Sequence, residues 1–230
     1  MGKIIMQYAY LIGCLIFFIV WLLFFTLRKD LRKEIIFGSI LALPFGFVER
    51  LWVPEYWDPP SLFNLISEYG VGLESFFFCF ICGGTAAVIY EIISRKKTVK
   101  TRLKHRYLFG PYISVAIIFI LLEFLFADKT IYNAIISLLI GAIIIAIKRK
   151  DLIGQIIFGG IFFAIVYFLL FLIFNRLFPD YTSTTYALEN LWGIIVLGVP
   201  LEEIIISFGA GAAWSSFYEY IKGYRTKNLA

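Results

Sequence analysis

Long apolar runs separated by short polar segments dominate this chain. A helix needs about 20 apolar residues to cross roughly 30 Å of bilayer hydrocarbon. Seven runs approach or exceed that length, so the pattern predicts an all-α integral membrane protein with seven transmembrane helices. The expected helices cover residues 8–27, 35–52, 71–93, 109–126, 131–147, 153–174 and 191–221. The last run is long enough to tilt or to begin with an irregular turn at Pro200.

Three blocks of sequence recur, which indicates an internal duplication. Spacing is kept within each block, and the matching pairs are 28–38 with 149–159, 54–56 with 179–181, and 73–91 with 201–219. We therefore expect a first three-helix unit at residues 8–95, a basic loop and linker helix at 96–129, and a second three-helix unit at 130–223. Because one helix joins two units of three, both units insert the same way round, as a parallel 3+1+3 repeat.

The composition excludes a water-soluble globular domain. Of the 230 residues, 61% are hydrophobic and 16% charged, whereas soluble domains are about half apolar and a quarter charged. The basic residues form short clusters between apolar runs, which argues against nucleic-acid binding. Cys14, Cys79 and Cys82 all lie within apolar runs, so we expect neither a disulfide nor a metal site.

Loop charges predict the orientation. Basic residues cluster in the segments 28–33, 95–106, 148–150 and 222–227, while the other loops are mainly acidic. By the positive-inside rule, this multi-pass protein of the cell membrane has its N-terminus outside and its C-terminus in the cytoplasm. The single histidine, His105, falls in the most basic loop, where we expect it to be solvated or near lipid headgroups.

Small residues gather on the third and seventh expected helices. Gly83 and Gly84 lie on the third, and the run 209–213 consists of glycine and alanine. Such residues let helices approach closely. They are equally suited to the wall of a substrate cavity, but close packing is the interpretation that we favour.

Carboxyl groups inside apolar runs are costly, at roughly 2.5–3.5 kcal/mol for an Asp at a helix centre. Five lie in the outer half of the expected bilayer: Glu49, Glu74, Glu123, Glu202 and Glu203. Glu202 has no cation nearby in the sequence. One protonated and one ionised carboxyl, as expected for two adjoining acids, would suit acid–base catalysis or proton-coupled transport. The residues thus predict a protonatable intramembrane site and leave both functions open.

A second acidic pair, Glu91 and Glu219, lies near the basic loops. Arg95 follows Glu91 by four residues, and Lys222 follows Glu219 by three. We interpret both acids as helix-end partners of these cations.

Several aromatic residues lie near the outer acids in the sequence. Aromatic faces stabilise cations, which suits a reaction that passes through a carbocation. Simple filling of the membrane interior explains them as well, since 19% of the chain is aromatic. With these alternatives in view, the residues expected to contact a substrate are Pro200, Glu49, Phe77, Phe78, Phe208 and Trp214.

The block Pro200-Leu201-Glu202-Glu203, with Leu191-Trp192-Gly193 before it and Tyr218-Glu219 after it, resembles the lycopene cyclase domain. This is a family of integral-membrane carotenoid cyclases. The resemblance extends over residues 8–95 and 130–223. The first unit departs from the family pattern, because Gly72-Leu73-Glu74-Ser75 replaces the usual Pro-x-Glu-Glu.

The resemblance implies an isomerase that needs no cofactor. A carboxylic acid protonates the terminal double bond of a linear polyene, the next double bond attacks the cation, and a carboxylate removes a proton to leave a ring. The implied catalytic residues are Glu202, Glu203 and, more weakly, Glu74. The implied partners are membrane lipids and an apolar polyene or isoprenoid that enters from the bilayer, and a homo-oligomer is left open. No metal is implied.

Two other functions remain open at this point. A parallel 3+1+3 repeat with intramembrane acids also suits a small-solute or proton-coupled transporter, which a lack of amides and charged pairs within the helices would disfavour. A structural subunit would use the acids only to contact partner helices. The sequence does not distinguish lycopene from another carotenoid or a meroterpenoid as the substrate.

Overall fold

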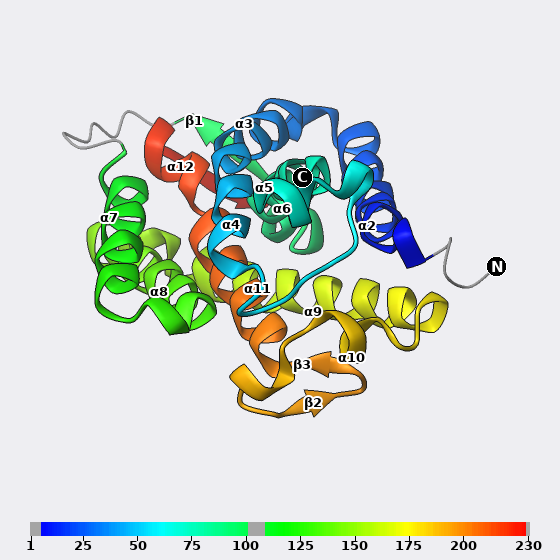
Figure 1. The fold of residues 1–230 in the computed structure, drawn as a ribbon. Coiled ribbons are helices and arrows are strands. Elements are labelled where there is room, and N and C mark those ends of the chain that lie inside the picture. Colours follow the sequence, from blue (N-terminus) through cyan, green and yellow to red (C-terminus); the bar gives the residue numbers. More distant parts are fainter. Residues whose placement is uncertain (1–5, 101–108, 229–230) are drawn as a thin grey trace.

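The computed structural model describes residues 6–100 and 109–228, and the chain is mostly helical (Figure 1). The α-helices are α2 (Ala9–Leu27), α3 (Arg32–Ala42), α4 (Glu49–Trp52), α5 (Leu65–Tyr69), α6 (Leu73–Ile93), α7 (Gly110–Leu125), α8 (Thr130–Lys148), α9 (Ile153–Leu177), α10 (Tyr181–Thr185), α11 (Leu201–Trp214) and α12 (Phe217–Lys222). The strands are β1 (Lys96–Lys100), β2 (Ile195–Val196), β3 (Val199–Pro200) and β4 (Tyr224–Asn228). His105, expected in a basic loop, lies outside the described residues.

Five helical segments in the described ranges are long and apolar enough to cross a membrane, which indicates a membrane protein. They are Ala9–Leu27, Lys29–Trp52, Leu73–Ile93, Ala127–Lys148 and Lys150–Leu177. The remaining two of the seven expected helices are shorter: α7 has 16 residues and α11 has 14. The seven-helix 3+1+3 arrangement therefore stays a prediction.

The second expected span is a broken helix. Its α-helical part, α3, ends at Ala42, and the 3-10 helix η2 (Leu43–Val48) carries the chain to α4. Pro44 lies at the start of η2. Proline donates no backbone hydrogen bond and clashes with the preceding turn, so an α-helix does not continue unchanged through it. The break places Glu49 in the first turn of α4.

The last apolar run was expected to be helical from Leu191 or to begin with an irregular turn at Pro200; the helical start at Leu191 is wrong, and the irregular start at Pro200 is confirmed. Strands β2 and β3 pair as a short antiparallel hairpin, visible below α11 in Figure 1, and the helix begins only at Leu201. Leu197 and Gly198 have positive φ values of 51° and 84°, as a tight two-residue turn requires. Pro200 then precedes the first helical residue and fixes where α11 starts.

Glycines allow two pairs of helices to pack with their backbones in close approach. A Cβ atom added at Gly83 of α6 would lie 2.6 Å from the carbonyl oxygen of Gly38 in α3. In the second half of the chain, one added at Gly211 of α11 would lie 2.7 Å from the carbonyl oxygen of Gly159 in α9. The prediction of close packing is confirmed at these glycines. Gly83 also reaches the cavity described below.

Arg28 and Arg149 make matching contacts in the two halves. Arg28 pairs with Asp30 at 2.8 Å and donates to the carbonyl of Lys96 in β1 at 2.7 Å. Arg149 pairs with Asp151 at 2.7 Å and donates to the carbonyl of Tyr224 in β4 at 2.8 Å. Strands β1 and β4 pair antiparallel, although residues 96–100 were expected to form a loop. This pairing joins the segments that follow the two halves.

Candidate active site in an apolar cavity

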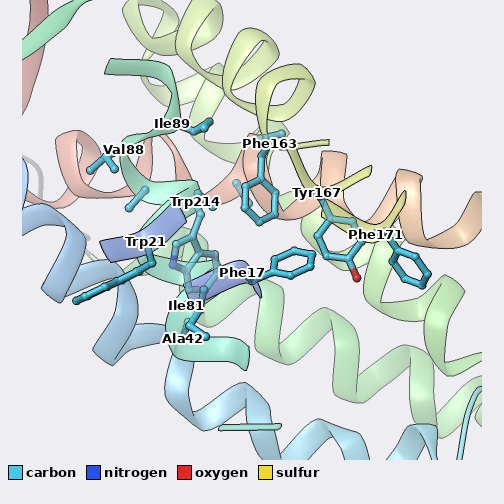
Figure 2. Close-up of a cluster of buried hydrophobic side chains, with 14 of the residues drawn as sticks. Phe17, Trp21, Ala42, Ile81, Val88, Ile89, Phe163, Tyr167, Phe171 and Trp214 are labelled. Atoms are coloured by element: carbon cyan, nitrogen blue, oxygen red, sulfur yellow. The ribbon is translucent and has the colours of Figure 1, made fainter. Parts of the chain in front are cut away.

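A cavity of about 570 Å³ lies between the two halves of the chain. Its wall includes residues of α2, η2, α4 and α6 from the first half and of α8 to α11 from the second. Figure 2 shows part of this wall, where Phe17 and Tyr167 lie edge to face with ring centroids 5.1 Å apart. Most of the lining side chains are aromatic or aliphatic, so the site is suited to an apolar ligand.

Glu203 is the carboxyl of the second half that faces the cavity. Three tyrosine hydroxyls donate to it: Tyr56 to Oε1 at 2.6 Å, Tyr186 to Oε1 at 2.8 Å, and Tyr167 to Oε2 at 2.5 Å. All four residues line the cavity. Burial, followed by the nearby Glu203 charge, raises the pKa of Tyr56 and of Tyr186 well above the ordinary value, so both hydroxyls keep their protons and act as donors.

Glu202 lies in the same first turn of α11, but its carboxyl faces away from the cavity. It is fully buried and is not among the cavity-lining residues. Its Oε1 accepts a hydrogen bond from the backbone N–H of Trp192 at 2.7 Å and another from the Tyr132 hydroxyl at 3.0 Å. Glu202 therefore ties the segment before the hairpin to α11 and α8.

Glu74 occupies the matching place in the first half. It lies in the first turn of α6, is buried, and accepts the backbone N–H of Leu62 at 2.6 Å. Ser75 follows it as Glu203 follows Glu202, and Ser75 lines the cavity. At both helix starts, the first residue of the pair holds the preceding loop and the second faces the cavity. Only the second half has an acid at the cavity-facing position.

Glu49 is the other acid in the cavity wall of the described chain. It is 3% exposed, and neither of its carboxylate oxygens has a hydrogen-bond partner among the described residues. The sequence placed it near the other outer acids as a substrate contact, and the structure brings it into the cavity with Glu203.

The other expected substrate contacts divide into two groups. Phe78 and Trp214 line the cavity, whereas Phe77, Phe208 and Pro200 lie outside its wall. Phe77 packs against Phe18 with ring centroids 5.4 Å apart. The ring of Phe208 lies against Gly160, and Pro200 belongs to strand β3. These three side chains fill helix–helix and hairpin contacts.

The second half of the chain, which contains Glu202 and Glu203, resembles a known family. Residues 129–221 match the family model described as Lycopene cyclase. This part of the chain belongs to the lycopene cyclase family. No curated protein and no solved structure that was compared matches the chain. The family indicates a membrane enzyme of carotenoid cyclisation, and the matched lycopene cyclase domain contains Glu202 and Glu203.

The sequence did not predict that the tyrosine hydroxyls around Glu203 belong to the site. Tyr56 comes from the first half and lies 147 residues from Glu203, and Tyr167 lies 36 residues away in the middle of α9. A phenol in the middle of an apolar helix is the one signal in the sequence that pointed to Tyr167. The position of Tyr56 follows only from how the halves pack.

Glu123, also expected near the outer acids, stabilises the turn between α7 and α8 instead. Its Oε1 accepts from the Asn133 amide at 2.7 Å, and its Oε2 accepts from Thr130 at 3.1 Å. These contacts join the end of α7 to the start of α8. Glu123 does not line the cavity.

A buried polar cluster lies outside the cavity. The amide of Gln155 donates to Glu91 Oε1 at 2.7 Å and to Glu219 Oε2 at 3.0 Å. The Thr98 hydroxyl lies 3.0 Å from both Glu34 Oε2 and Glu219 Oε1. Carboxylate oxygens of the three acids lie within 4.8 Å of one another. Asn133 and Gln155 thus bind glutamates within the helices, so the expected lack of intramembrane amides was wrong.

The expected pairing of the inner acids with nearby cations is also wrong. Within the described residues, no ion pair joins Glu91 to Arg95 or Glu219 to Lys222. The Lys222 ammonium lies 5.5 Å from the centroid of the Phe37 ring instead. Both acids are fully buried because they point between helices toward Gln155 rather than along their own helix surface.

Proposed function

We propose that this chain cyclises the end of a linear carotenoid or a related isoprenoid by a proton-initiated isomerisation. One observation carries the proposal: the Glu203 carboxyl, held by three tyrosine hydroxyls, faces an apolar cavity. The cavity volume of about 570 Å³ falls within the range of small-ligand sites, roughly 300–1,000 Å³. The family match supports the same chemistry.

The reaction begins when a proton adds to the terminal double bond of the polyene and leaves a tertiary cation. The next double bond attacks this cation and closes a six-membered ring, and loss of a neighbouring proton restores neutrality. No electrons are transferred in sum, so the reaction as proposed needs no redox cofactor. Aromatic rings of the wall, including Phe17, Phe78 and Trp214, are suited to stabilise the cation.

Glu203 is assigned as the base that removes the final proton. Hydrogen bonds to a charged group are stronger than those between neutral groups, and three hydroxyl donors compensate the charge of an ionised carboxylate. A base fixed at both oxygens is also held in one orientation toward the cavity. Proton transfer to or from a side chain held in position in this way typically accelerates a reaction 100- to 10,000-fold.

Catalytic roles for Glu202 and Glu74 remain predictions. Their carboxyls bind backbone amides of the preceding loops and lie outside the cavity wall. The geometry therefore favours a positioning role for both: each fixes the start of the helix whose next residue faces the cavity. We extend the proposal to an N-out, C-in topology and to lateral entry of substrate from the bilayer.

Expression in a host that accumulates lycopene tests the proposed function. Extracted pigments should include cyclic carotenoids with the wild-type chain, and Glu203→Gln should lower ring formation by about 100- to 10,000-fold. Glu34→Gln is the matched control, because Glu34 is also a buried carboxyl but lies in the buried polar cluster with Glu91 and Glu219, outside the cavity wall. Loss of conversion in both variants, at equal membrane expression, would place the chemistry elsewhere.

A further inference from the structure

Glu49 is a buried carboxyl without a partner. It is 3% exposed, and both of its carboxylate oxygens lack hydrogen-bond donors among the described residues. No ion pair of the described chain includes it, and the neighbouring Arg50 is exposed. Glu74 and Glu202, by contrast, each bind a backbone amide through one carboxylate oxygen, so Glu49 is the cavity acid whose carboxylate has no described partner at either oxygen.

The two acids of the cavity wall have opposite surroundings. Glu203 receives three hydroxyl donors, whereas Glu49 receives none among the residues described. Burial without compensation disfavours the charged form of a carboxyl, and donors favour it. A neutral carboxyl carries a proton that it can transfer, and an ionised one can accept a proton. The two acids thus differ in the way that an acid–base pair requires.

The asymmetry between the halves explains why the second acid comes from outside the repeated motif. Position 75 faces the cavity as position 203 does, but it is a serine whose hydroxyl accepts the N–H of Gly72 at 3.1 Å. The first half therefore brings no carboxyl to the cavity from the start of α6. Glu49 brings one from the start of α4, after the helix break at Pro44.

We propose that Glu49 is the proton donor that starts the cyclisation, an inference that rests on the proposed function. The Glu49 O–H bond breaks, and the electron pair of the terminal double bond forms a new C–H bond. After ring closure, Glu203 removes a proton from the carbon next to the cation, and that C–H electron pair becomes the ring double bond. Glu203 then gives up its proton to solvent and Glu49 takes one from solvent, which resets the site, so product and substrate are isomers.

Turnover in D₂O tests the donor directly. We would supply linear lycopene in lipid nanodiscs to the purified full-length chain and analyse the products by mass spectrometry. Each ring formed by the wild type should carry one deuterium, at the carbon that received the proton. Glu49→Gln should lower ring formation at least 100-fold while still binding lycopene, because glutamine has the same shape and no acidic proton. Glu49→Asp should regain part of the turnover with the label.

The base and donor variants should fail differently. Glu203→Gln should still form the cation, so its slower products should keep the deuterium and shift toward alcohols or other double-bond isomers. Glu34→Gln should behave as the wild type. Labelled rings formed by Glu49→Gln at the wild-type rate would refute this inference alone. A wild-type chain that binds lycopene but converts none would refute the proposed function and this inference with it.

Discussion

The three tyrosines around Glu203 are not equivalent, and this difference gives a graded prediction. Tyr167 is the only described donor to Oε2, at 2.5 Å, whereas Tyr56 and Tyr186 share Oε1 at 2.6 and 2.8 Å. Tyr167→Phe removes the hydroxyl without changing the ring and leaves Oε2 without its donor. Tyr56→Phe and Tyr186→Phe each leave a second donor on Oε1.

A hydrogen bond to a charged group contributes about 1.5–3 kcal/mol, and a tenfold change in rate corresponds to about 1.4 kcal/mol. Tyr167→Phe should therefore slow ring formation roughly 10- to 150-fold, because the Glu203 carboxylate loses its one described donor at Oε2. Either of the Oε1 variants should have a smaller effect. Initial rates with lycopene in nanodiscs, at matched protein concentration, give the comparison.

The control for this series is Tyr112→Phe. Tyr112 lines the same cavity, but its hydroxyl donates to the carbonyl of Leu41 at 3.2 Å rather than to an acid. It should lose little activity. Wild-type rates in Tyr167→Phe, with the fold intact, would mean that Glu203 does not act as an ionised base. Equal losses in Tyr167→Phe and Tyr112→Phe would indicate a general effect on the cavity wall.

Two further predictions concern packing and topology. Gly211→Ala should lower the thermal unfolding midpoint in detergent, with a cost of about 1–3 kcal/mol, because the added Cβ would lie 2.7 Å from the carbonyl oxygen of Gly159. Gly154→Ala, which meets nothing within 4 Å, should leave the midpoint unchanged or raise it. A cysteine introduced at Asp180 should react with an impermeant maleimide from outside intact cells and one at Lys97 should not; the reverse pattern would overturn the N-out orientation.

Hydropathy predicted the helices whose sequence is apolar throughout and failed where an apolar segment is not helical. Residues 191–200 are as apolar as a membrane helix, so a length criterion alone includes them. The hairpin there depends on backbone conformation at Leu197 and Gly198 and on Pro200. In the same way, α3 ends where Pro44 interrupts an apolar run. Proline and glycine, rather than polarity, mark these boundaries.

The sequence located the buried acids but could not separate their roles. Glu202 and Glu203 are neighbours in one motif, yet adjacent helical residues point in different directions, and only Glu203 reaches the cavity. Its donors come from distant segments, so no local spacing identifies them. Glu49 has no motif around it. Its significance depends on the lack of a hydrogen-bond donor among the described residues, which only the structure reveals, and on the serine at position 75, whose place in the cavity wall the sequence could not show.

The two halves of the chain repeat a framework but distribute polar groups unequally. Glu34 of α3 corresponds to Gln155 of α9, and the amide of Gln155 donates to Glu91 and Glu219 of the buried polar cluster. A carboxylate at position 155 would instead add a fourth acid to that cluster. At the cavity, Ser75 corresponds to Glu203, so the first half contributes its carboxyl from Glu49. If the two halves lined the cavity identically, the same group would be available for adding a proton to the substrate and for removing one from the cation. Proton addition and proton removal need different groups, and the unequal halves supply one each: Glu49 from α4 and Glu203 from α11.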